Sequence, residues 1–342
     1  MVEENPYEVD PQVLKRFDER DTVFVRKLWD EDAIFYGKPE YRSIAPQRIA
    51  EKRPGFTRVG YARLMAAWDM PHILQSFQSW KRLNPNDEIL FKLGQYQVDD
   101  PVSMSLQVKE TAQLYGATLV GITDVNPLWI YCNDANGDPI EIESAYRYAV
   151  VIGVELAAEA IATSPFYLAA TATALGYGQM AYVTIAVAQF IRNLGYRAIP
   201  ASNDTALSIP LAINAGLGQL GRNGLLVTPQ YGSRIRLCKV FTDLPLVLDQ
   251  PIDFGLTEFC RTCQRCADAC EAGAISRDPD PSYSVACVSN NHGIKRWAVN
   301  ADQCYAFWQK NGASCSNCIA VCPFAKKPSG SQKTPASPRQ SA

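Results

Sequence analysis

Cys260-Arg-Thr-Cys263-Gln-Arg-Cys266-Ala-Asp-Ala-Cys270 is the stretch of this sequence that decides most about the fold. In this C-x2-C-x2-C-x3-C spacing, a short loop presents three thiolates to one [4Fe–4S] cluster, and the fourth cysteine, on the following helix, usually reaches a second cluster. Structural zinc sites share the C-x2-C step, but they normally use two separated pairs. The spacing therefore favours iron and sulfur over zinc.

A second cysteine group lies downstream and repeats the pattern with its first member displaced. It consists of Cys304 and the run Cys315-Ser-Asn-Cys318-Ile-Ala-Val-Cys322-Pro323. The usual crossed pairing of two such motifs predicts two clusters that lie close together and pass single electrons along a line. The predicted ligands are Cys260, Cys263, Cys266 and Cys322 for cluster one, and Cys270, Cys304, Cys315 and Cys318 for cluster two.

The composition is that of an ordinary globular chain. Of 342 residues 47% are hydrophobic, and 33 Lys and Arg against 35 Asp and Glu leave no basic excess that would suit a nucleic acid or an anionic membrane. The N-terminal Met-Val-Glu-Glu-Asn lacks the basic and apolar segments of an export signal. Residues 160–191 carry no charge, but proline, glycine and hydroxyl side chains interrupt them, which favours a buried helix pair over a membrane span.

Four regions are expected along the chain. They are a loop- and helix-rich N-terminal wrap (1–100), an α/β or α+β core (101–254), a bacterial ferredoxin-like module for the two 4Fe–4S clusters (255–327) and a disordered tail rich in Ser, Pro and Lys (328–342). Apolar periodicity predicts core helices over 102–116, 166–175, 177–194 and 207–215. The expected core strands are 117–122, 148–154, 197–199, 225–228 and 235–242.

A glycine-rich run in the core matches the G-x-G-x-x-G pattern of dinucleotide sites. It is Gly216-Leu-Gly218-Gln-Leu-Gly221, with Asp243 further on. The run follows a predicted helix and precedes a predicted strand, which inverts the strand–turn–helix order that places a pyrophosphate on a helix N-terminus. This order disfavours NAD or flavin binding.

Longer segments around these glycines carry a resemblance. Asn203-Asp-Thr-Ala-Leu-Ser-Ile-Pro210, Ala215-Gly-Leu-Gly-Gln-Leu-Gly-Arg-Asn-Gly-Leu-Leu-Val-Thr228, Tyr231-Gly-Ser-Arg-Ile-Arg236 and Lys239-Val-Phe-Thr-Asp-Leu-Pro245 resemble the corrinoid-dependent reductive dehalogenases. The segment from Cys304 to Pro323 is also similar to the end of these proteins, with its cysteine, Phe-Trp pair, glycine and C-x2-C-x3-C-P run. The resemblance covers about residues 100 to 325. It implies a nitroreductase-like core that binds cobalamin in the base-off state, in the vicinity of Gly216, Gly218 and Gly221.

The resemblance also implies a catalytic group, which falls on Tyr177, Asn203 and Arg236. Reductive removal of halide consumes two electrons and a proton, so a proton donor is needed. A phenol with an ordinary pKa of about 10 keeps its proton at neutral pH, and a nearby guanidinium stabilises the phenolate that remains. An amide such as that of Asn203 can orient the phenol or bind the departing halide.

Partners and location are implied by the resemblance alone. The expected partners are a small organohalide substrate, an electron donor protein or quinol-linked chain and a small membrane-anchor subunit, and no nucleic acid is expected. Members of the family are exported to the outer face of the cytoplasmic membrane. Because no signal is evident here, a mature or trimmed form and a cytoplasmic protein both stay open.

Two other functions stay open as alternatives. One is an epoxyqueuosine reductase-like enzyme, which would also combine a corrinoid with two clusters but act on transfer RNA. The other is a non-catalytic iron–sulfur subunit that only transfers electrons. Cobalt bound beside the iron separates both enzymes from the electron carrier.

Overall fold

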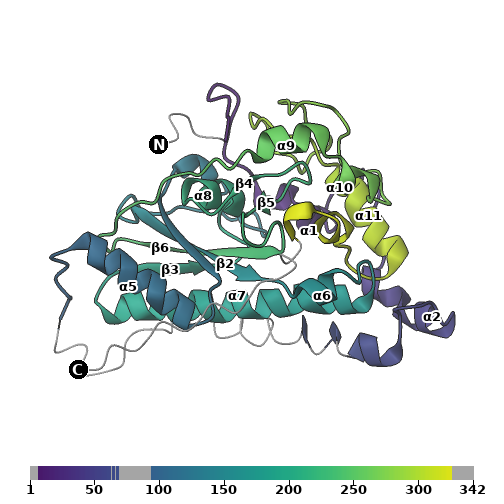
Figure 1. Ribbon diagram of the computed structural model, residues 1–342, viewed down its shortest axis with the longest axis horizontal. Coiled ribbons are helices and arrows are strands. Elements are labelled where there is room, and N and C mark those ends of the chain that lie inside the picture. Colours follow the sequence, from purple (N-terminus) through teal and green to yellow (C-terminus); the bar gives the residue numbers. More distant parts are fainter. Residues whose placement is uncertain (1–6, 63, 66, 69–93, 326–342) are drawn as a thin grey trace.

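The computed structural model describes residues 7–62, 64–65, 67–68 and 94–325, and an antiparallel four-stranded sheet lies at its centre (Figure 1). The strand order is β1–β2–β6–β3. The bounds are β1 Leu119–Asp124, β2 Tyr148–Glu155, β3 Ala198–Ala201 and β6 Ile235–Thr242. Every pairing is antiparallel, so the core is an α+β fold. The nitroreductase likeness stays a prediction.

Helices cover both faces of this sheet (Figure 1). α5 (Pro101–Leu114) and α7 (Tyr167–Asn193) lie on one face, and α8 (Ser208–Asn214) lies on the other. Since side chains alternate along a strand, Cys238 and Val240 of β6 pack toward α7, while Leu237 and Phe241 pack toward α8. The strands are therefore apolar on both faces.

Helix α7 corrects one prediction, since the expected pair over 166–175 and 177–194 is a single helix of 27 residues. Pro165 precedes the helix and Gly176 does not break it. A Cβ on Gly176 would lie 2.6 Å from the Cδ2 atom of Leu156, so the glycine permits close packing inside the helix. Within the described residues α7 alone is long and apolar enough to cross a membrane, but it packs against β3 and β6 as a core helix does.

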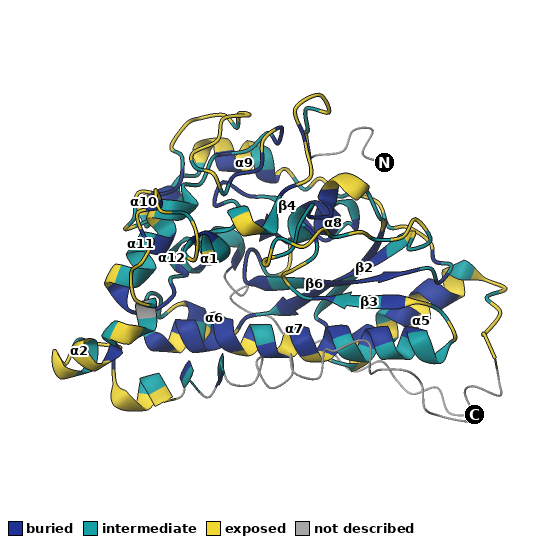
Figure 2. Cartoon of the chain, turned by 180° about the vertical axis from the view of Figure 1, so that it is seen from behind, coloured by how far each residue is buried: buried dark blue, intermediate teal, exposed yellow. Residues whose placement is uncertain are grey.

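The cysteine-rich module lies at one end of the sheet, where Figure 2 shows its helices above α6 (Ala158–Ile161). Its helices are α9 Leu256–Thr262, α10 Arg265–Asp268, α11 Ala301–Asn311, α12 Asn317–Ala320 and the 3-10 turn Pro323–Ala325. A two-stranded ribbon, β4 (Gln219–Leu220) with β5 (Leu226–Val227), joins it to the core. A Cβ on Gly232 would lie 2.4 Å from the backbone of Phe324, so this glycine lets the core touch the end of the module.

The N-terminal segment contacts the cysteine-rich module. Its short helices include α1 (Val23–Arg26) and α2 (Ala45–Ala50), with 3-10 turns at Glu19–Asp21 and Tyr41–Ile44. Arg26 forms an ion pair with Asp302 of α11 at 2.7 Å, and the ring of Phe24 packs edge-on against that of Tyr305. The segment thus ties the module to the rest of the chain. The predicted tail, 328–342, lies outside the described residues.

Candidate cluster sites and active site

The first predicted set of cysteines lines one cavity. Its walls include Cys260, Cys263, Cys266 and Cys322, which come from α9, the turn after it, α10 and the turn after α12. Burial raises the pKa of the Cys266 thiol to about 11, and the charges of Cys260 and Cys322 raise it further. A thiolate is therefore unfavourable here unless a metal compensates its charge.

The sulfurs of the second predicted set also lie close enough to affect one another. Burial raises the pKa of Cys304 to about 12, and the charges of Cys315 and Cys270 act in the same direction. The pKa of Cys318 is raised well above its usual value by burial and by the other three sulfurs of its set. Cys266 of the first set also acts on Cys318, so the two sets are neighbours.

A mononuclear site and an iron–sulfur cluster need their cysteines in different arrangements. Over the described ranges no three His, Cys, Asp or Glu side chains are placed to hold a single metal ion. Zinc needs its four ligands within about 2.3 Å of one centre, whereas a cluster takes one thiolate at each of four irons. The x2 and x3 spacings of the cysteines favour a multi-iron group.

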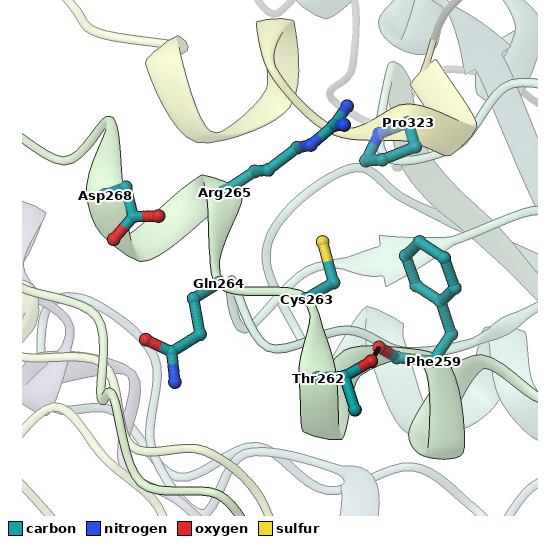
Figure 3. A pocket seen from close by; sticks show the side chains of 7 residues that line it. All are labelled: Phe259, Thr262, Cys263, Gln264, Arg265, Asp268 and Pro323. Carbon is teal, nitrogen blue, oxygen red and sulfur yellow. Dashed lines mark hydrogen bonds between the residues drawn. The ribbon is translucent and has the colours of Figure 1, made fainter.

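An open cavity of about 710 Å³ lies over the first set (Figure 3). Its lining residues are Phe259, Thr262, Cys263, Gln264, Arg265, Asp268 and Pro323. In Figure 3 the sulfur of Cys263 points into the space between Arg265, Pro323 and Phe259. These four residues also line the inner cavity, so the first set lies directly beneath the surface.

Two members of the predicted catalytic trio are in contact. Tyr177 is half-buried on α7, and the Cζ atom of Arg236 on β6 lies 5.2 Å from the centroid of its ring. The pair is also close to the module. A Cβ on Gly176 would touch both Arg236 and Leu156, and Leu156 packs with the apolar cluster that includes Cys318 and Cys322.

A ring from the N-terminal segment also stacks on this tyrosine. Trp68 stacks on Tyr177 with ring centroids 5.5 Å apart and an interplanar angle of 27°. The Cζ atom of Arg42 lies 5.6 Å from the centroid of a Trp68 ring, so each of the two stacked side chains has a guanidinium near it. Sequence reasoning did not place Arg42 or Trp68 beside Tyr177, because no local spacing connects the N-terminal segment with α7.

Three buried polar atoms on these side chains or beside them lack partners. The Nε of Arg236, the Nε1 of Trp68 and the Oγ1 of Thr173 have no hydrogen-bond partner among the described residues. Thr173 lies one helical turn before Tyr177, hence on the same side of α7. Buried donors are normally satisfied, so this grouping fits a site that receives a polar ligand.

The third member of the trio comes from a different element. Asn203 is exposed in the loop after β3, and no hydrogen bond joins its side chain to Tyr177 or Arg236. The loop itself is firmly held. The fully buried Lys239 donates to the carbonyl oxygens of Ser202, Asp204 and Ala206, at 3.1, 2.6 and 2.9 Å. Thr205, between them, has φ = 69°, a conformation that costs a β-branched residue about 1–3 kcal/mol.

The glycine-rich run is explained in part by contacts within the chain. A Cβ on Gly218 would lie 2.2 Å from the carbonyl oxygen of Val227, and one on Gly216 would lie 2.5 Å from that of Gln250. Gly221 lines the inner cavity of the first cysteine set. A corrinoid near these glycines stays a prediction. His292 is exposed in the cysteine-rich module, and His72 lies outside the described residues.

Comparisons with known proteins agree with this picture. Residues 259–326 match the 4Fe-4S dicluster domain family. The tetrachloroethene reductive dehalogenase of Dehalobacter restrictus is 36% identical over 274 residues, which cover 68% of this chain and 50% of that protein. The chain thus spans about half the length of the curated relatives it matches.

A solved structure and a shorter match complete the comparison. A reductive dehalogenase described in terms of B12-dependent dehalogenation is 25% identical with a TM-score of 0.74, over 95% of this chain and 44% of that one. An epoxyqueuosine reductase of Lactococcus garvieae is 42% identical, but over 72 residues only, 21% of this chain. The long matches, the shared fold and the dicluster domain place this chain in the reductive dehalogenase family.

Proposed function

We propose that this chain carries out reductive dehalogenation of a small organohalide, with electrons supplied through two [4Fe–4S] clusters to a base-off corrinoid. The observation that carries the proposal is the Tyr177–Arg236 pair, which has unpartnered buried polar atoms on Arg236 and on nearby side chains and is joined to the cysteine-rich module through Leu156. Family membership supports the reaction class, since the relatives that match are named reductive dehalogenases.

The cysteine sets are proposed as the cluster ligands. Cys260, Cys263, Cys266 and Cys322 would hold cluster one, and Cys270, Cys304, Cys315 and Cys318 would hold cluster two. Support comes from the cavity that the first set lines and from the mutual effects of the second set on its pKa values. The open cavity over Cys263 supports cluster one as the cluster that would accept electrons from an external donor.

The donors beside Tyr177 fit a large polar cofactor. Arg236 Nε, Trp68 Nε1 and Thr173 Oγ1 would hold polar groups of the corrinoid or of the substrate, since each is buried and lacks a partner within the described part of the chain. When bound, the corrinoid supplies a strongly reducing cobalt centre.

Side chains of the protein would supply the proton that the reaction consumes. The overall reaction takes the organohalide, two electrons and one proton to the dehalogenated compound and a halide ion. Tyr177 would give its phenolic proton to the carbon that loses the halogen, and the guanidinium of Arg236 would stabilise the phenolate left behind. Asn203 would orient the phenol or bind the halide once the substrate is present.

Removal of the Tyr177 hydroxyl tests whether this residue is the proton donor. In Tyr177→Phe, the stack on Trp68 can be retained while the hydroxyl is lost. Halide release with a viologen donor should fall at least about 100-fold, the usual contribution of a general acid, with iron and cobalt contents unchanged. Tyr182→Phe, on the exposed side of the same helix, is the control. Undiminished turnover in Tyr177→Phe would remove Tyr177 from the role.

The ligand sets make a separate prediction about iron. Cys322→Ser and Cys260→Ser should each reduce the iron content from about eight to about four and abolish the same paramagnetic signal, because both belong to cluster one. Cys304→Ser should abolish the other signal, and Cys287→Ser, outside both sets, should change neither. If Cys322→Ser removed the signal that Cys304→Ser removes, the crossed assignment would be wrong.

The alternatives differ in measurable ways. Cobalt near one per chain after reconstitution supports an enzyme, and protein that retains iron but takes up no cobalt would favour the electron carrier. Turnover of epoxyqueuosine-modified RNA without halide release would favour the epoxyqueuosine reductase-like enzyme. The electron donor, the anchor subunit and export stay predictions.

A further inference from the structure

A buried cation lies beside the first set of cysteines. Arg222, between β4 and β5, is 1% exposed. Its guanidinium donates to the carbonyl oxygen of Cys260 at 2.7 Å and to those of Ser276 and Asp278 at 2.9 and 2.8 Å. Its Cζ atom also lies 4.6 Å from the centroid of a Trp297 ring. Neutral groups thus fix the side chain in one place.

This arginine differs from the other buried arginines that form ion pairs. Arg26 pairs with Asp30 and Asp302, and Arg234 pairs with Glu155 at 2.7 Å. Within the described ranges no ion pair joins Arg222 to an Asp or Glu side chain. Burial of a charge without a counter-ion costs several kcal/mol, so a negative group is expected nearby.

The first set of cysteines occupies the position where that negative group is needed. Arg222 and all four cysteines of the set line the same cavity. A [4Fe–4S] core held by four thiolates carries a net charge of two minus, and one added electron makes it three minus. A fixed cation beside the cluster stabilises both states, and the reduced state more strongly.

We propose that Arg222 is the counter-ion of cluster one and raises its reduction potential. The inference rests on the proposed assignment of Cys260, Cys263, Cys266 and Cys322 to a cluster. The step it affects is the gain of one electron from an external donor, with no bond made or broken. Arg222 thereby helps the cluster nearest the surface to accept electrons.

The experiment is a redox titration of the reconstituted protein with dithionite, followed by EPR. Arg222→Met removes the charge and keeps much of the side-chain bulk, while Arg222→Lys keeps the charge. Arg265→Met is the matched control, because Arg265 lines the same cavity but is exposed, so that water screens its charge.

In Arg222→Met, the ratio of reduced to oxidised cluster at a fixed potential should fall at least tenfold, about 59 mV for a one-electron couple. The change should affect only the signal that Cys260→Ser abolishes. Arg222→Lys and Arg265→Met should stay within about threefold of the wild type. A change below threefold in Arg222→Met, or an equal change in both clusters, would overturn the inference.

If Arg222→Met loses cluster one, a further variant still tests whether the charge of Arg222 stabilises the cluster. Arg222→Gln keeps amide donors for the carbonyl oxygen of Cys260 but carries no charge. If Met and Gln at this position both lose cluster one and Lys retains it, the loss follows charge and supports the counter-ion. If Lys loses it as well, hydrogen-bond geometry is the cause and the inference is wrong. Wild-type protein without two clusters would instead refute the proposed function.

Discussion

Replacement of Lys239 by methionine should loosen the loop that presents Asn203. The side chain of Lys239 is fully buried, and its three N–H donors are shared among the carbonyl oxygens of Ser202, Asp204 and Ala206 and the hydroxyl oxygen of Ser208. Methionine fills a similar volume but donates no hydrogen bond. The carbonyl oxygens of Ser202, Asp204 and Ala206 would then lose the ammonium, although that of Asp204 still accepts from the N–H of Ala206. The turn at Thr205, with φ = 69°, would be held less firmly.

The magnitude follows from two opposing effects. Three hydrogen bonds from a charged donor stabilise the fold by about 6 kcal/mol at about 2 kcal/mol each. Burial of the ammonium offsets part of this, because it lowers the pKa of Lys239 from 10.5 to about 8, which corresponds to about 3 kcal/mol. The net loss of unfolding free energy in Lys239→Met is therefore about 3 kcal/mol.

Urea unfolding of equally loaded proteins, followed by tryptophan fluorescence, measures this difference. Lys109→Met is the matched control, since Lys109 pairs with Asp249 at 2.6 Å but is partly exposed and should change the stability by less than about 1 kcal/mol. Limited proteolysis should cut within residues 202–208 faster in Lys239→Met. Equal midpoints for both variants, with no faster cleavage, would refute the view that the ammonium holds this loop.

Two further predictions concern stability. Burial, with the charge of Asp204 adding to it, raises the pKa of Glu19 from 4.5 to about 7, so the folded protein holds a proton that the unfolded chain releases between these values. The contribution of this proton to the stability is complete below pH 4.5 and is lost as the pH rises through 7. Between pH 5 and 8 the unfolding free energy of the wild type should therefore fall by about 1–2 kcal/mol relative to that of Glu19→Gln, as measured by urea unfolding of both proteins. The same pH dependence in both proteins would contradict this. Gly232→Ala should lower the melting temperature by at least about 5 °C, because its Cβ atom would lie 2.4 Å from the backbone of Phe324. The iron content should fall as well. An unchanged melting curve would contradict this prediction.

The parts of this molecule that depend on local spacing could be predicted from the sequence. The strand predicted over 235–242 has those bounds, and the four cysteines predicted for cluster one line one cavity. The first core strand begins two residues later than predicted, at Leu119, because Ala117 and Thr118 still belong to the turn after α5. Local patterns therefore determined the elements and left their ends uncertain by a residue or two.

Contacts between distant segments could not be predicted. Gly176 suggested a helix break because glycine is a poor helix former, yet a Leu156 side chain occupies the space beside it and the helix continues. Trp68 meets Tyr177 across more than a hundred residues of chain, and Arg222 lies beside cysteines that come far later in the sequence. No periodicity in a single sequence records such neighbours.

Strand β6 carries two residues with different roles, Arg236 and Lys239, at an interval of three positions. Arg236 faces α7 and the tyrosine, while Lys239 faces the opposite layer and the Asn203 loop. An odd separation in a strand puts two side chains on opposite faces, so one inserted or deleted residue between them would turn one of the two away from its target. Related sequences should therefore vary freely in the loops around this strand but keep the two-residue interval between arginine and lysine unchanged.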